Sequence, residues 1–201
     1  MSKFPSLSAH PEMVEVLTAH PEGFGPLFEY HDAILRGPSP LSVAERELIA
    51  AYVSGLNQCQ FCFDTHRISA ETHGVDLETF DTLIADPAAA GIEERLLPLL
   101  AYARKLTLTP TSMSDADAAA VYAAGWDEKA LFHTISVTGL FNLMTRLVAG
   151  TGITANPTAQ QSIRERIAKD RNNPSPYADF AKRIRAAGER AILGDAMVGR
   201  E

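Results

Sequence analysis

Apolar side chains recur every three or four positions along most of the chain, which is the spacing of one face of an α-helix. Glycine, proline and asparagine interrupt this pattern and mark the ends of the predicted helices. The segments predicted to be helical are 11–18, 21–35, 43–54, 59–73, 76–85, 92–106, 115–124, 127–149, 159–170 and 175–193. No segment shows the strict alternation of a half-buried strand, so the sequence predicts an all-α protein.

Three of these segments carry further expectations. The segment 127–149 is apolar on nearly every face, so we expect it at the centre of the protein or in the interface of a homo-oligomer. Pro98 is predicted either to kink the helix 92–106 or to delay its start. His31, within 21–35, either points toward the cysteine-containing helix or packs in the core.

A capping-box pattern opens the stretch that holds both cysteines. Ser42 is followed three residues later by Glu45, and this pair predicts a helix that begins near Val43. A break at residues 55–57 ends that helix, and a second helix is predicted to begin beside Cys59. If the break is tight, the two helices form an antiparallel pair.

Both cysteines and a histidine share one face of the second helix. Cys59, Cys62 and His66 occupy positions i, i+3 and i+7, which at about 100° per residue fall within roughly 60° of arc. In an antiparallel pair, Glu47 on the first helix lies opposite Cys62 and His66. The stretch can therefore bring together a carboxylate, an imidazole and two thiols.

The composition is that of a compact protein with a buried core. Of the 201 residues 46% are hydrophobic and 21% are charged, and we expect a single helical domain over 1–201, with a core at about 20–155 and a helical extension at 156–201. The chain shows neither a signal peptide nor an apolar run of the roughly 18 to 20 residues that span a membrane, so we expect a cytoplasmic protein. A formal charge of −7 disfavours nucleic acids and acidic membranes as partners.

The cysteine pair admits several kinds of chemistry. In a reducing compartment two cysteines three positions apart indicate redox chemistry or a metal rather than a structural disulfide. The helix N-terminus favours Cys59 as the more acidic thiol, whereas proximity to His66 favours Cys62, and we expect Cys62. Zinc bound by Glu47, Cys59, Cys62 and His66 is one alternative, and two inert cysteines are another. A thioredoxin-like site would follow a β-strand, which this sequence does not predict.

The sequence around these residues resembles the alkyl hydroperoxidase D-like (AhpD-like) family of the carboxymuconolactone decarboxylase superfamily, most closely its longer, peroxidase-related members. The shared pattern is a glutamate, eleven residues, Cys-x-x-Cys, three residues and a histidine, met here by Glu47, Cys59, Cys62 and His66. Further similar segments are Leu41-Ser42, Glu45-Arg46-Glu47-Leu48-Ile49, Val53-Ser54-Gly55-Leu56-Asn57 and Phe141-Asn142 with Arg146. The resemblance covers about residues 20–155.

This resemblance implies an all-helical oligomer, a trimer or hexamer with a dimer as the alternative, and a CxxC pair at the start of a core helix. It also implies a thiol-dependent peroxidase, in which Cys62 attacks an organic hydroperoxide or hydrogen peroxide and Cys59 resolves the sulfenic acid into a disulfide. Glu47 and His66 would relay protons. An external dithiol is expected as the reductant, and no bound cofactor or metal is expected.

The chain departs from the family pattern at one position, and two other functions stay open. Characterised members have a second histidine just before the attacking cysteine, where this chain has Phe61. A decarboxylase of the γ-carboxymuconolactone type is one alternative, although nothing in that chemistry requires a CxxC pair. A non-catalytic redox sensor with the same reversible disulfide is the other, and it differs from a peroxidase in turnover.

Overall fold

The computed structural model describes the backbone of residues 2–198 and the side chains of residues 2–187. Within this part of the chain the regular structure consists of ten α-helices and four short 3₁₀ helices, without a strand, which confirms the predicted all-α class. The α-helices are α1 Met13–Ala19, α2 Phe24–Leu35, α3 Val43–Leu56, α4 Gln60–Thr72, α5 Thr79–Thr82, α6 Leu97–Leu108, α7 Asp115–Ala123, α8 Glu128–Thr151, α9 Gln160–Lys169 and α10 Pro176–Val198. Not one of them, over the described residues, combines the length and apolar character needed to cross a membrane.

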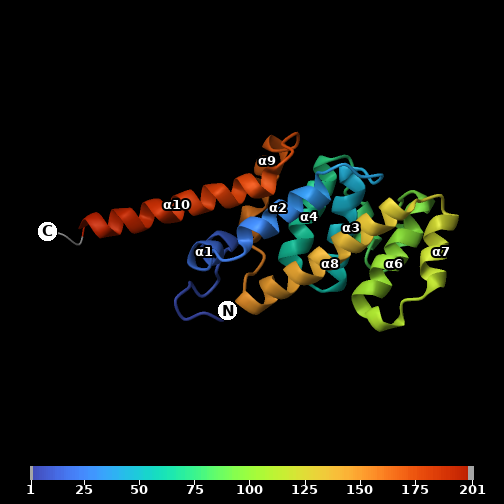
Figure 1. Ribbon diagram of the computed structural model, residues 1–201, viewed down its shortest axis with the longest axis horizontal. Coiled ribbons are helices and arrows are strands. Elements are labelled where there is room, and N and C mark those ends of the chain that lie inside the picture. Colours follow the sequence, from blue (N-terminus) through green and yellow to red (C-terminus); the bar gives the residue numbers. More distant parts are fainter. Residues whose placement is uncertain (1, 199–201) are drawn as a thin grey trace.

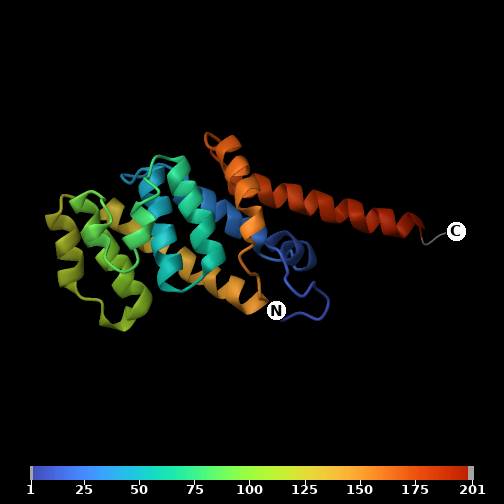
Figure 2. The same cartoon turned by 180° about the vertical axis from the view of Figure 1, so that it is seen from behind.

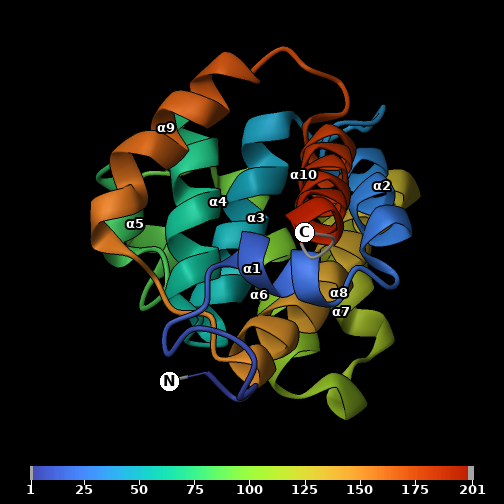
Figure 3. The same ribbon diagram turned by 90° about the vertical axis from the view of Figure 1, so that its left-hand side faces the viewer.

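Helix α8 runs through the body of the molecule, and α2, α3, α4, α6 and α7 pack against it (Figure 1). In the view from behind, α4 and α9 lie on the side of the body that faces the viewer, and α6 and α7 lie together at one end (Figure 2). Helix α10 extends away from the body toward the C-terminus. Seen along α10, α9 lies beside α4, and α10 lies beside α2 (Figure 3).

The main core lies between α3, α6 and α8. Ile49, Tyr52, Leu99, Val137 and Phe141 are each at most 1% exposed. Full burial of an apolar side chain of this size contributes about 1.5–3 kcal/mol relative to leaving it in water. This packing holds α3 rigidly, and α3 in turn positions α4.

Helices α3 and α4 form the predicted antiparallel pair. The Ser42 Oγ accepts a hydrogen bond from the Glu45 amide at 3.2 Å, and the Glu45 carboxylate accepts one from the Ser42 amide at 2.6 Å, which completes the capping box. The break between the helices is tight because Gln58 adopts a left-handed φ of 56°. The Cys59 amide then donates to the Ser54 carbonyl at 3.0 Å, which places Cys59 as the N-cap of α4.

Several predicted boundaries differ from the structure. Pro98 delays the start of its helix and does not kink it, because it is the second residue of α6 and follows the 3₁₀ turn Glu94–Leu96. The predicted helix 76–85 is reduced to α5, because the amides of Ala85 and Asp86 turn back to the Thr82 carbonyl. The first two helices begin two and three residues later than predicted, and α10 continues to Val198.

Candidate functional site

The two thiols lie together at the N-terminal end of α4. Cys59 is the N-cap and Cys62 lies in the first turn, and their Sγ atoms are 2.7 Å apart. Both are free thiols, and the two residues are only 9% and 4% exposed. The apolar side chains that pack around them are Leu7, Met13, Val16, Phe61, Val148 and Ile153.

The two thiols differ in acidity. Hydrogen bonding between them lowers the pKa of Cys59 and raises the pKa of Cys62, and burial acts to raise both. The Cys62 backbone amide further lowers the pKa of Cys59. This direction agrees with the argument from the helix N-terminus and runs against the expectation that Cys62 is the more acidic thiol. A proton acceptor near Cys62 is therefore needed if Cys62 is to react as a thiolate.

Glu47 lies on α3, with no solvent exposure, at the centre of a network of charged and polar groups. One carboxylate oxygen accepts a hydrogen bond from His66 Nδ1 at 2.6 Å, and the other pairs with Arg36 Nη1 at 2.6 Å. The Tyr177 hydroxyl donates to the second oxygen at 3.3 Å. Burial alone would raise the pKa of Glu47, but Arg36 and then His66 outweigh burial and lower it well below its ordinary value. Glu47 is therefore ionised at neutral pH.

His66 lies one helical turn after Cys62, and one of its two ring nitrogens is hydrogen-bonded to Glu47. Its Nδ1 donates to Glu47, which fixes the ring orientation and makes Nε2 the proton-accepting nitrogen of the neutral ring. The ring also packs edge-on against Phe141, with centroids 4.2 Å apart. No side chain or carbonyl among residues 2–187 hydrogen-bonds to Nε2, so this atom is available for proton exchange.

Arg36 and Tyr177 are the site residues that sequence reasoning missed. Tyr177 reaches Glu47 from the C-terminal extension, because Asp32 on α2 accepts the backbone amides of Tyr177 and Ala178 at 3.1 and 2.8 Å and so holds the start of α10. Burial and the charge of Glu47 raise the pKa of Tyr177, which keeps its hydroxyl a donor. Neither residue belongs to a local motif, and their contact depends on tertiary packing.

The contacts of His31 decide between the two positions expected for it, and the described side chains bear on the zinc alternative. His31 is a core residue that is 2% exposed, with Nδ1 bonded to the Leu27 carbonyl and its ring against Phe28, Phe141 and Tyr177. The zinc alternative finds no support in the part of the chain whose side chains are described, since no three His, Cys, Asp or Glu side chains there are arranged to hold a metal ion.

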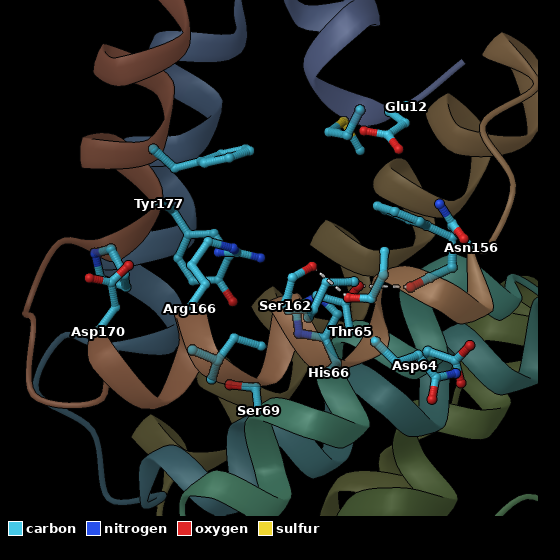
Figure 4. A pocket seen from close by; sticks show the side chains of 18 of the residues that line it. Glu12, Asp64, Thr65, His66, Ser69, Asn156, Ser162, Arg166, Asp170 and Tyr177 are labelled. Carbon is cyan, nitrogen blue, oxygen red and sulfur yellow. Dashed lines mark hydrogen bonds between the residues drawn. The ribbon is translucent and has the colours of Figure 1, made fainter. Parts of the chain in front are cut away.

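A cavity of about 340 Å³ opens beside His66 (Figure 4). Its walls come from α1, α2, α4, α8, α9, α10 and the segment before α9. Phe61, the residue at the position of departure from the family pattern, is part of the wall. Neither Cys59 nor Cys62 lines the cavity.

One family model and several solved structures are similar to this chain. Residues 21–105 match the model of the carboxymuconolactone decarboxylase family, which spans the four predicted site residues. A crystal structure of an uncharacterized peroxidase-related protein from Silicibacter sp. TM1040 is similar to this chain with a TM-score of 0.68 and 24% identity, covering 75% of this chain and 79% of that one. A second, described as an alkylhydroperoxidase AhpD core and peroxidase-related protein from Ralstonia eutropha JMP134, has a TM-score of 0.68, 25% identity and the same coverage. No curated protein matches the sequence.

Proposed function

From its carboxymuconolactone decarboxylase family match over residues 21–105 and the fold that it shares with peroxidase-related proteins, we propose that this chain is a thiol-dependent hydroperoxide reductase. The observation that carries the proposal is the pair of free thiols, 2.7 Å apart, with Cys62 one turn before His66, which is oriented by the buried carboxylate of Glu47. A dithiol so placed can be oxidised to a disulfide with little movement of the backbone.

The proposed reaction has three steps. The Cys62 sulfur attacks the terminal oxygen of the hydroperoxide, the O–O bond breaks, and the substrate leaves as an alcohol while Cys62 becomes a sulfenic acid. The Cys59 sulfur then attacks the sulfenic sulfur, which forms the Cys59–Cys62 disulfide and releases water. An external dithiol reduces this disulfide by thiol–disulfide exchange, so that two electrons from the dithiol reduce one hydroperoxide.

His66 and Glu47 take the proton-handling role. Because hydrogen bonding to Cys59 and burial raise the pKa of Cys62, its proton must be accepted by a neighbouring base before attack. The free Nε2 of His66 is that base, and it then returns the proton to the departing alkoxide. Glu47 is ionised and saturated by Arg36, His66 and Tyr177, so we assign it to orienting His66 and stabilising its charge.

A turnover assay with a dithiol reductant tests the proposal. We expect the reduced protein to convert many equivalents of cumene hydroperoxide to the alcohol when dithiothreitol is supplied, and thiol alkylation to abolish this activity. One round of oxidation without turnover would instead identify a redox sensor. Decarboxylation of a muconolactone that survives thiol alkylation would identify the decarboxylase.

Substitution of each cysteine tests the roles. In Cys59→Ser the sulfenic acid on Cys62 cannot be resolved, so peroxide should carry Cys62 on to the sulfinic acid. In Cys62→Ser, Cys59 should react with peroxide much more slowly, because Cys59 lies about two helical turns before His66, whereas Cys62 lies one turn before it. Mass spectrometry of the peptides after peroxide treatment decides, and oxidation of Cys59 alone at the wild-type rate would exchange the two roles.

A further inference from the structure

The cavity beside His66 has an apolar wall and an uneven distribution of charge. Its volume of about 340 Å³ lies in the range of small-molecule sites. Apolar side chains of α1, α4, α9 and α10 form much of the wall, including Met13, Phe61, Ile163, Ile167 and Phe180. The apolar part of the wall fits the hydrocarbon body of a ligand.

Arg166 on α9 gives one end of the cavity a positive charge. Its guanidinium carbon lies 5.3 Å from the centroid of the Phe180 ring, and the guanidinium forms no hydrogen bond or ion pair with residues 2–187. The neighbouring carboxylate of Asp170 is paired with Arg183 at 3.7 Å. Burial lowers the pKa of Arg166, while Tyr177 and the Asp170 carboxylate, which also lines the cavity, partly oppose this shift. Arg166 is thus a cation that an anionic ligand group can reach.

The opposite end of the cavity repels anions. Figure 4 shows Glu12 and Asp64 across the cavity from Arg166, with His66 on the floor between the two ends. Arg36, which also lines the cavity, is neutralised by its pairing with Glu47. A ligand with one carboxylate therefore binds in one direction, with that group at Arg166.

The cavity and the thiols share two wall residues. Met13 and Phe61 line the cavity and also pack on the cluster that contains Cys59 and Cys62. Both side chains are only partly buried, so their rotation can join the two spaces without moving a helix. His66 adjoins both spaces, since it lines the cavity and lies one turn after Cys62.

We propose that this cavity binds organic hydroperoxides that combine a hydrocarbon body with a carboxylate, and that Arg166 holds the carboxylate. This inference rests on the proposed hydroperoxide reduction and assigns its substrate class. The apolar wall holds the hydrocarbon body, and the hydroperoxide group reaches Cys62 past Phe61 and Met13. Fatty-acid hydroperoxides have this chemistry, whereas hydrogen peroxide gains nothing from the cavity.

Binding of decanoate, measured by titration calorimetry on the reduced protein, tests the site without any reaction. Arg166→Gln should weaken decanoate binding at least about threefold, as expected for a partly exposed ion pair. Lys169→Gln makes the same charge change on α9, but Lys169 lies outside the cavity lining, so this variant should bind like the wild type. Ser162→Phe should fill the cavity and prevent binding, while Ser162→Ala should not.

Reduction kinetics then connect binding to substrate choice. Arg166→Gln should raise the KM for a hydroperoxy fatty acid by a similar factor and leave reduction of hydrogen peroxide unchanged. The inference is overturned if decanoate does not bind, or if Arg166→Gln and Lys169→Gln bind decanoate with the same affinity. Either result overturns it even when the protein reduces cumene hydroperoxide and hydrogen peroxide. If decanoate binds with the expected pattern but no hydroperoxide is reduced by the wild type, the proposed function fails and the hydroperoxide assignment fails with it.

Discussion

Glu47 is fully buried and still carries a charge, because Arg36 and His66 each approach one of its oxygens to 2.6 Å. Removing one member of a buried ion pair leaves the other unpaired, which typically costs about 3–5 kcal/mol. The network thus contributes to folding as well as to orientation of His66, and tests at this site must separate the two.

Glu47→Gln should slow peroxide turnover by about 10² to 10⁴-fold, the usual range for loss of proton-transfer assistance. Alkylation of the thiols by iodoacetamide should change much less, because alkylation needs a thiolate but no proton delivery to a leaving group. Arg36→Met combined with Glu47→Gln is the control, since it removes the unpaired cation and should recover stability without recovering turnover. Equal losses in turnover and alkylation would mean that Glu47 only maintains the fold.

His31 makes stability depend on pH. Burial, opposed in part by the Leu27 carbonyl, lowers the pKa of His31 from 6.5 to about 4, so the folded state binds fewer protons than the unfolded state in this range. The contribution of His31 to the free energy of unfolding is fully present above about pH 6.5. It is lost as the pH falls through about 4, a change of about 3 kcal/mol. Denaturant unfolding at several pH values should show a shallower decline in His31→Gln, with exposed His10→Gln as the control. Parallel slopes in all three proteins would contradict this.

At the residue scale the sequence predicted the local part of the site. Cys59, Cys62 and His66 share a helix, and Glu47 lies on the adjacent helix, so helical period and one tight break place all four. Arg36 and Tyr177 join the same network from residues far along the chain. No spacing rule connects such positions, because their contact depends on how α2 and α10 pack.

At the scale of elements, the start of α10 is part of the site. Asp32 accepts hydrogen bonds from the first amides of α10, which fixes Tyr177 against Glu47. Arg36 also makes a cation–π contact with Tyr177, with the guanidinium carbon 5.4 Å from the ring centroid. The sequence predicted a helix here and treated 156–201 as an extension. The role of α10 in the site could not be predicted, because its amphipathic pattern indicates one buried face but not which helix packs against that face.

Tyr177→Phe should keep the packing of α10 and remove the hydroxyl that donates to Glu47. A hydrogen bond to a charged group contributes about 1.5–3 kcal/mol, and at 3.3 Å we expect the lower end of that range. Denaturant unfolding should show this loss, and Tyr30→Phe, at an exposed position of α2, should show none. A stability equal to the wild type in both variants would mean that the hydroxyl does not bind Glu47.

At the scale of the whole molecule, α8 presents an apolar strip to solvent. Phe132, Ile135 and Leu143 are 59%, 36% and 46% exposed, although the same helix is buried on its other faces. The nearly all-apolar sequence of this segment predicted a place at the centre of the protein or in an oligomer interface, and the buried faces of α8 agree with the first of these. An exposed strip of this kind on a central helix favours self-association.

We therefore expect Phe132→Glu to shift the protein from an oligomer, a trimer or hexamer or else a dimer, toward the monomer. A charge in an apolar interface must be desolvated without a partner, which opposes association. Tyr122→Glu, at an exposed aromatic position on α7, is the matched control and should leave the oligomer intact. Sedimentation at micromolar concentration measures this, and a monomeric wild type would refute the interface.

The most direct test of the proposed thiol chemistry is a single turnover with limiting substrate. Reduced protein is mixed with one equivalent of cumene hydroperoxide, and remaining thiols, alcohol formed and intact mass are measured together. The proposed mechanism predicts that two thiols disappear for each alcohol formed and that the protein loses the mass of two hydrogen atoms, with Cys59 and Cys62 joined in one peptide. Alcohol formed with both thiols retained, or thiols unchanged after excess hydroperoxide, would contradict it.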